Sequence, residues 1–206
     1  MAERLSITEQ FGKSLAELLS AKIETVHPEF NSESFILAIE NGVPDKSYTQ
    51  RIVFIAKKLN EYLPQKYEEA LGILTGILGD ENPNETGMFT EYWWIMPIGK
   101  FVELYGLDHY DLSIKAIAEI TKRNTGEYAI RPYIRKYPEK SLQQMKTWAK
   151  SEDFHLRRLA CEGLRPKLPW SPKLDTFNDN PQVVFDILEL LKEDEIMFVK
   201  KSVGNH

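Results

Sequence analysis

The sequence predicts an all-α protein built as a solenoid of stacked helices. Apolar residues recur at helical spacing in one segment after another, and no segment alternates apolar and polar residues as a half-buried strand does. Prolines, glycines and acidic residues divide the chain into ten or more short helices joined by tight turns. Many short helices in succession, without strands between them, favour a helical solenoid.

The expected helices can be placed in order along the chain. A polar loop at 79–87 follows the first four, and the second has Asn31 or Ser32 as its N-cap. The segment 88–105 is expected to be helical on both sides of Pro97. Helices are expected at residues 3–26, 32–41, 48–62, 66–78, 88–105, 111–122, 125–137, 138–150, 154–164, 181–191 and 196–203.

Two of these helices share a pattern that is typical of HEAT-like repeats. An apolar residue followed by two cations occurs at 156–158 (Leu-Arg-Arg) and at 199–201 (Val-Lys-Lys), each time after an acidic turn. A polar residue, Glu162 or Asn205, follows six positions after the apolar one. The separation of about forty residues is the length of such a repeat.

The chain is expected to form one domain over residues 1–206. An N-terminal helical part covers about 1–86, and basic catalytic repeats cover about 88–206. The last predicted helix, 196–203, ends close to His206 without a C-cap, whereas stacked repeats end in a polar capping repeat. Two interpretations stay open, a truncated chain and an unusual end.

The composition is that of an ordinary globular protein, with 42% hydrophobic and 28% charged residues. The single cysteine, Cys161, excludes an intramolecular disulfide and is interpreted as a small packed residue rather than a nucleophile. No apolar run has the length of a membrane span, and the N-terminus lacks the apolar core of a signal peptide. We therefore expect a cytoplasmic protein with no membrane partner.

The charge of the chain is unevenly distributed. Residues 122–173 hold thirteen basic and five acidic side chains, a balance of +8, which leaves −13 for the remainder because the whole chain carries −5. A basic middle between acidic ends is either chance clustering or the electrostatic footprint of a polyanion such as nucleic acid.

The motifs of several enzyme classes are absent from the sequence. The four histidines have no metal-ligand spacing, and there is no phosphate-binding glycine loop and no nucleophile elbow. No metal and no cofactor are therefore expected. The catalytic candidates are Glu127 and Glu162, two carboxylates in basic surroundings. A glutamate at a helix start, as predicted for Glu127, often only favours the helix dipole. Two carboxylates facing one groove would suit glycosyl cleavage, which builds positive charge on a sugar.

The stretch HLRRLACEGLRPKLPW at 155–170 has the densest chemistry in the chain. Its apolar residues follow helical spacing, and Pro166 and Pro169 end the helix, so that a carboxylate, several cations and Trp170 converge near its end. One interpretation is an amphipathic helix with a solvated charged face and Trp170 in the core. The other is a site in which Trp170 probes bases or sugars.

This stretch resembles the RRLxSEGxRPRLPW signature of the AlkC family of alkylpurine DNA glycosylases. Three further stretches agree with the family: YGLDH at 105–109, TGEYAIRPYI at 125–134 and VKKSVGN at 199–205. The resemblance covers about residues 5–206. Departures are Cys161 in place of a common serine and Gly126 before Glu127. Family members also usually continue beyond VKKSVGN with further repeats.

The resemblance implies a curved HEAT-like solenoid whose concave face binds double-stranded DNA with alkylated bases. It implies a monofunctional DNA glycosylase that hydrolyses the N-glycosidic bond of cationic bases such as 3-methyladenine or 3-methylcytosine. It implies that Glu127 and Glu162 are catalytic and that Trp170 probes the DNA. The cations expected to contact phosphates are Arg131, Arg157, Arg158, Arg165, Lys167, Lys200 and Lys201. A monomer is expected.

Two other functions stay open at this point, a non-catalytic HEAT-like module that binds DNA and a protein-binding scaffold. A concave basic surface that holds Glu127, Glu162 and Trp170 together would favour the glycosylase. A position of Glu162 within the solenoid core would count against it.

Overall fold

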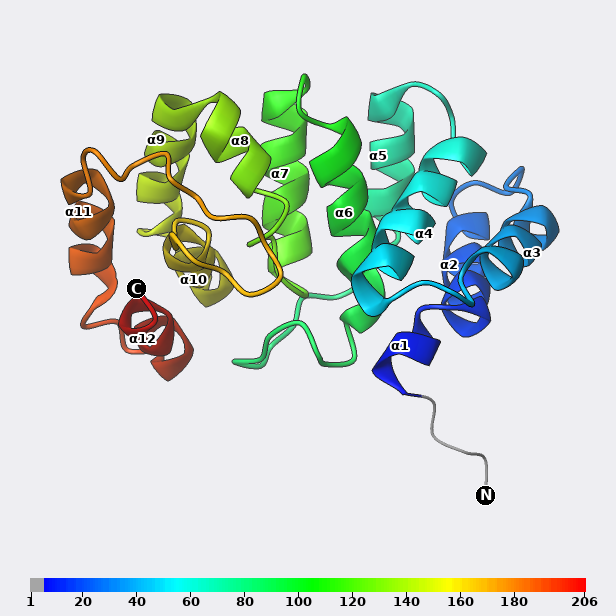
Figure 1. Cartoon of the computed structure of the whole chain (residues 1–206), viewed down its shortest axis with the longest axis horizontal. Coiled ribbons are helices and arrows are strands. Elements are labelled where there is room, and N and C mark those ends of the chain that lie inside the picture. Colours follow the sequence, from blue (N-terminus) through cyan, green and yellow to red (C-terminus); the bar gives the residue numbers. More distant parts are fainter. Residues whose placement is uncertain (1–5) are drawn as a thin grey trace.

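The computed structural model describes residues 6–206, which form helices, turns and loops without a strand. The helices follow one another along the long axis of the molecule, from α1 to α12 (Figure 1). The prediction of an all-α fold is confirmed. The elements are α1 (Ile7–Gln10), α2 (Lys13–Glu24), α3 (Ser32–Gly42), α4 (Tyr48–Tyr62), α5 (Tyr67–Gly76), the 3-10 helix η1 (Trp93–Ile95), α6 (Met96–Tyr105), α7 (Tyr110–Thr121), α8 (Arg131–Lys136), α9 (Pro138–Trp148), α10 (Phe154–Glu162), α11 (Gln182–Leu191) and α12 (Met197–Gly204).

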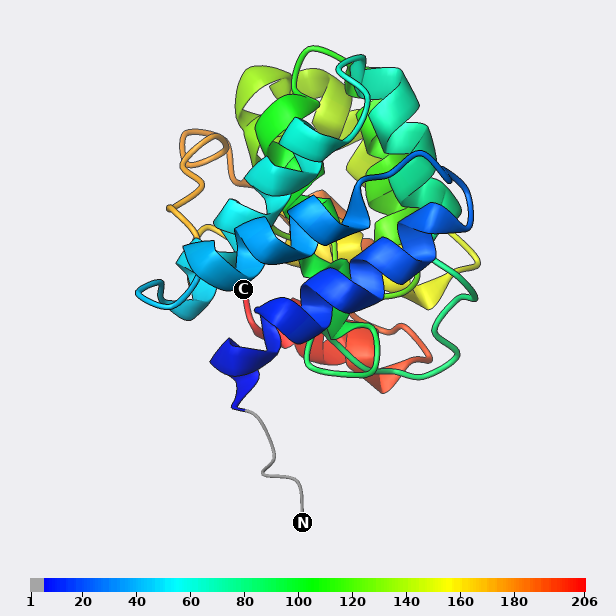
Figure 2. The ribbon, with the colours of Figure 1, turned by 90° about the vertical axis from the view of Figure 1, so that its right-hand side faces the viewer.

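Each helix packs mainly on helices close to it in the chain, as in a solenoid. Helix α2 packs on α3, α3 on α4, α4 on α6 and α6 on α7, while α10 contacts α9, α11 and α12. The apolar faces join into one core that extends from Phe11 to Val199. Seen from the N-terminal end, α2 and α3 lie in front, and the loop after α10 projects to one side (Figure 2). No helix in residues 6–206 is long and apolar enough to span a bilayer.

The first predicted helix, 3–26, is divided in two, and its first residues lie outside the described range. Helix α1 ends at Gln10 and α2 begins at Lys13, with Phe11 between them. Phe11 is fully buried, and its ring meets the edges of Tyr48 and Trp93, each at a centroid distance of 5.1 Å. The chain turns at Phe11 because this aromatic packing determines its position.

The segment 88–105 is helical from Trp93 onward, so helix is present on both sides of Pro97 as predicted, but residues 88–92 are not helical and residues 93–95 form a 3-10 turn. The Asn124 side-chain amide donates to the carbonyl oxygens of Met88 at 3.2 Å and Tyr92 at 2.9 Å. A distant side chain therefore satisfies the Met88 carbonyl, and the Tyr92 carbonyl accepts both from Asn124 and from the backbone N–H of Ile95. Pro97 lies in the first turn of α6, where its missing N–H is tolerated.

The prediction of a helix over 125–137 also needs correction, because α8 begins only at Arg131. Residues 125–126 are irregular and residues 127–130 form a turn, and the Thr125 hydroxyl accepts from the backbone N–H of Glu127 at 3.3 Å. Glu127 therefore precedes the helix and does not open it. The other eight predicted helices are confirmed, and their ends differ from the prediction by at most two residues.

The polar loop at 79–87 is anchored by Asn82, which is 3% exposed. The backbone N–H of Asn82 donates to the carbonyl oxygen of Lys122 at 2.9 Å, and the His155 ring nitrogen Nε2 bonds to the carbonyl oxygen of Asn82 at 3.0 Å. The loop thereby links the end of α7 to the start of α10.

Candidate functional site

Two buried glutamates meet at one arginine. Glu127 comes from the turn before α8, Glu162 is the last residue of α10, and each is 3% exposed. The Arg158 nitrogen Nη2 lies 2.9 Å from Glu127 Oε2 and 3.7 Å from Glu162 Oε1. Arg158 and Glu162 share a face of α10 because they are four residues apart. The structure thus brings the two carboxylates singled out in the sequence into one cluster.

Further donors surround both carboxylates. The Thr125 hydroxyl donates to Glu127 Oε2 at 2.9 Å. Arg165, in the turn after α10, donates to Glu162 Oε2 at 2.9 Å, and the Asn205 amide approaches Glu162 Oε1 at 3.4 Å. Glu162 is therefore buried among polar groups of α10 and α12, and not in the apolar core.

The charges around Glu162 keep it ionised. Burial by itself raises the pKa of a carboxyl group. At Glu162 the neighbouring charges of Arg158 and Arg165 outweigh that effect and hold the pKa below its ordinary value. Near neutral pH this carboxylate is an anion, so it can stabilise a nearby positive charge but cannot act as an acid.

Trp170 is one of the most exposed large apolar residues in the described range, with 64% of its surface accessible. The interpretation of Trp170 as a core residue is therefore wrong. Its backbone has a φ of 59°, an unusual value for a residue with a large side chain. The indole makes tilted, edge-on contacts with Phe89 and Tyr48, with ring centroids 6.0 and 6.3 Å apart.

Arg131 holds the loop that carries Trp170. It is 1% exposed, and its guanidinium donates to the carbonyl oxygens of Arg165 and Pro172, both at 2.8 Å. Burial lowers the pKa of Arg131 to about 10. This position differs from the expected phosphate contact, because the guanidinium is enclosed and already engaged inside the protein.

Arg157 likewise faces inward, contrary to the expected phosphate contact. Its guanidinium binds the carboxylate of Asp194 through two nitrogens, at 2.6 and 3.1 Å, and also donates to two backbone carbonyls. Lys167 and Lys201 are exposed and Lys200 is half-buried, and no ion pair is formed by these three within residues 6–206.

Much of the basic middle of the chain is neutralised within the protein. Cations of this region pair with acidic side chains from several helices and loops: Lys122 with Glu81 and Glu119, Arg123 with Glu119, Lys136 with Asp108, Lys140 with Asp111, and Arg157 with Asp194. The local balance of +8 is therefore not a continuous free patch.

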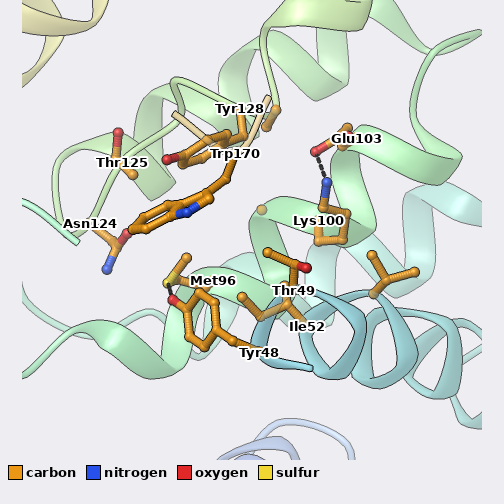
Figure 3. Close-up of a pocket in the computed structure, with 13 residues that line it drawn as sticks. Tyr48, Thr49, Ile52, Met96, Lys100, Glu103, Asn124, Thr125, Tyr128 and Trp170 are labelled. Atoms are coloured by element: carbon orange, nitrogen blue, oxygen red, sulfur yellow. Dashed lines mark hydrogen bonds and ion pairs between the residues drawn. The ribbon is translucent and has the colours of Figure 1, made fainter. Parts of the chain in front are cut away.

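A hollow lies beside the glutamate pair and is lined by α4, α6, the segment before α8 and Trp170 (Figure 3). Thr125 and Tyr128, which flank Glu127 in the sequence, belong to its lining. Tyr48, Asn124 and Tyr128 could not be recognised as site residues from the sequence, because no local motif connects these separate segments. The residues that line the hollow are Tyr48, Thr49, Ile52, Val53, Met96, Gly99, Lys100, Glu103, Asn124, Thr125, Tyr128, Ala129 and Trp170.

Comparison with known proteins places this arrangement in context. Residues 107–206 match the family described as DNA alkylation repair enzyme. The chain is 34% identical to the uncharacterized protein YhaZ of Bacillus subtilis (strain 168), over 97% of the chain and 54% of that protein. It is also similar to Pseudomonas fluorescens alkylpurine DNA glycosylase AlkC, solved bound to DNA containing an abasic site analog. That match has a TM-score of 0.87 and 28% identity, over 98% of the chain and 54% of AlkC. The chain spans about half the length of these relatives.

Proposed function

We propose that this chain, whose residues 107–206 match the family of DNA alkylation repair enzymes, is a monofunctional DNA glycosylase for cationic alkylated bases in duplex DNA. The observation that carries the proposal is the pairing of Glu127 and Glu162 through Arg158, next to a hollow rimmed by the exposed Trp170. Bases of the 3-methyladenine and 3-methylcytosine type are the proposed substrates.

The chemistry suits a site with two carboxylates and no acid. A base alkylated in this way carries a positive charge, so the C1′–N bond breaks with its electron pair leaving on the base, which departs neutral. The sugar develops oxocarbenium character, which a nearby anion stabilises, and a water molecule then adds to C1′ and loses a proton. In this proposal Glu162 supplies the negative charge and Glu127 orients the water.

The surrounding residues have four different roles in this proposal. Arg158 and Arg165 form the edge of the site, with 14% and 18% of their side chains exposed, and Lys167, Lys200 and Lys201 contact phosphates. Arg131 and Arg157 are positioning residues, because their guanidiniums hold the Trp170 loop and Asp194. Trp170 contacts the duplex at the lesion.

The substitution Glu162→Gln tests the assigned role. We expect release of free methylated base from N-methylated duplex DNA, measured by chromatography, to fall by about 10²–10³-fold, because an amide cannot offset the charge on the sugar. Glu193→Gln is the matched control, since Glu193 is exposed after α11. Release by Glu162→Gln at the wild-type rate, with helical content retained, would contradict the role.

A second candidate is a DNA-binding module without catalysis. It is favoured by the burial of both carboxylates and by their ion pairs with Arg158 and Arg165, which leave little direct access. This candidate predicts salt-sensitive binding of duplex DNA by the wild-type chain and no release of base from methylated DNA at any protein concentration.

A further inference from the structure

The Asn124 side chain has one oxygen that forms no hydrogen bond. Asn124 is 2% exposed, and its oxygen Oδ1 has no hydrogen-bond partner within residues 6–206. Its amide nitrogen donates to the carbonyl oxygens of Met88 and Tyr92, and these two bonds fix which end of the amide is the acceptor. Buried polar groups are nearly always paired in proteins, so an unpaired acceptor at this position calls for a ligand.

Asn124 lines the hollow, and its oxygen lies on the side of the Trp170 indole (Figure 3). The hollow measures about 610 Å³ with its open mouth included. Tyr48, Tyr128 and Trp170 provide aromatic walls, and Ile52 and Val53 provide apolar surface. Aromatic walls with few polar groups favour a flat, ring-shaped ligand.

A hydrogen-bond donor faces the same space. Within residues 6–206 the Tyr48 hydroxyl donates to the sulfur of Met96, at 3.1 Å, and a thioether is a weak acceptor. Burial raises the pKa of Tyr48 to about 12, so the hydroxyl keeps its proton near neutral pH. The hollow therefore combines an unpaired acceptor, a weakly engaged donor and aromatic rings.

We propose that this hollow binds the nucleobase released by the reaction, an amino-bearing purine or pyrimidine. The exocyclic amino group of the base donates to Asn124 Oδ1, the Tyr48 hydroxyl donates to a ring nitrogen, and the ring stacks against the aromatic walls. The choice of base rests on the proposed function. The site lies next to the glutamate pair because Thr125 and Tyr128 flank Glu127.

Binding requires the Trp170 indole to move, since Asn124 Oδ1 is enclosed in the unliganded arrangement. Trp170 can do so because it is 64% exposed and its ring contacts are the tilted ones with Tyr48 and Phe89. Occupation of the hollow by the base therefore changes the environment of the indole.

Calorimetric titration of the full chain with free bases tests this site. We expect 3-methyladenine to bind at least tenfold more tightly than 3-methylpurine, which is the same ring without the amino group, because a site built for a hydrogen bond rejects the analogue that lacks it. We also expect Tyr48→Phe to weaken 3-methyladenine binding severalfold. Tyr62→Phe, on the same helix and outside the hollow, is the matched control and binds like the wild type.

Equal affinity for the two bases, or no binding of either, would overturn the proposal. Base release from methylated DNA is measured on the same preparation, so that the two proposals fail separately. Release without binding of the free base refutes the site and leaves the glycosylase intact. Selective binding without release supports the site and refutes the hydrolysis.

Discussion

At the scale of single residues, the arginines of the basic region have different partners. Arg131 binds backbone carbonyls, Arg157 binds Asp194, and Arg158 and Arg165 bind the two glutamates. A guanidinium has five donors in a rigid plane and stays charged when buried, which suits it to each of these positions. Exposure, and not residue type, decides which cation is free to meet a phosphate.

The substitution Arg157→Ala is expected to lower the stability of the protein and to leave its affinity for DNA unchanged. Only 6% of the Asp194 side chain is exposed, so Arg157→Ala leaves that carboxylate buried without its partner. The free energy of unfolding, measured by urea denaturation, should fall by about 3–5 kcal/mol. Lys201→Ala, at an exposed position, should change it by less than about 0.5 kcal/mol. Unchanged stability of Arg157→Ala together with weaker DNA binding would restore the original phosphate assignment.

At the scale of elements, the segment before α8 is held tightly against α7. A Cβ atom at Gly126 would lie 2.5 Å from the Thr121 hydroxyl oxygen and 2.7 Å from a methyl carbon of Ile117. Glycine permits this close approach, and the approach sets the position of Glu127. Gly72, within α5, has no atom within 4 Å of the same test position.

The pair Gly126→Ala and Gly72→Ala should therefore change stability in opposite directions. Gly126→Ala should lower the free energy of unfolding by about 1–3 kcal/mol through overpacking and should also slow base release. Gly72→Ala should raise that free energy by about 0.5–1 kcal/mol, because alanine favours a helix over glycine. Denaturation curves of both variants check this, and a stabilising Gly126→Ala would mean that the segment is loosely packed.

At the scale of the whole molecule, seven of the thirteen cations in residues 122–173 are paired with acidic side chains. The chain carries −5, and much of its basic middle is paired with acidic side chains of other segments. The proposed contacts with the backbone then depend mainly on Lys167, Lys200 and Lys201, together with the edge arginines of the site.

The salt dependence of DNA binding, measured for single lysine substitutions, should show which of these lysines contacts a phosphate. Lys167→Ala and Lys201→Ala are each expected to reduce the slope of log K against log salt concentration by about 1, measured by fluorescence anisotropy with a labelled duplex. Lys13→Ala, whose lysine pairs with Glu40 near the N-terminal end, should leave the slope unchanged. A slope that all three substitutions lower equally would indicate diffuse attraction without a defined contact surface.

The sequence was sufficient to place most helices, because apolar periodicity and stop residues are local signals. It misplaced the boundaries that distant residues decide. Phe11 breaks a helix because Tyr48 and Trp93 receive its ring, and residues 88–92 turn because Asn124 binds their carbonyls. Contacts between residues so far apart in the chain cannot be predicted from local sequence patterns.

In the candidate site, too, residues in local motifs could be predicted from the sequence, and contacts between distant residues could not. Glu127, Glu162 and Trp170 could be singled out because they stand in motifs along the chain. The partners of Arg131 and Arg157 could not, since the Arg157 carboxylate partner, Asp194, is 37 positions away. The hollow escaped prediction because it forms only where four separate segments meet.

The anchoring of the loop at 79–87 has a consequence for acid sensitivity. Burial holds the pKa of His155 below its ordinary value of 6.5, so the neutral ring belongs to the folded state. As the pH falls below about 6.5, the unfolded chain takes up this proton first, and the free energy of unfolding falls until the pH has passed through the lowered pKa. The cause is the burial of the ring, which disfavours its charged form more than the hydrogen bond to the Asn82 carbonyl oxygen favours it. Limited proteolysis should therefore cut residues 79–92 faster in mild acid, before the helical content falls. The loop that links α7 to α10 would then be the first part of the chain to detach.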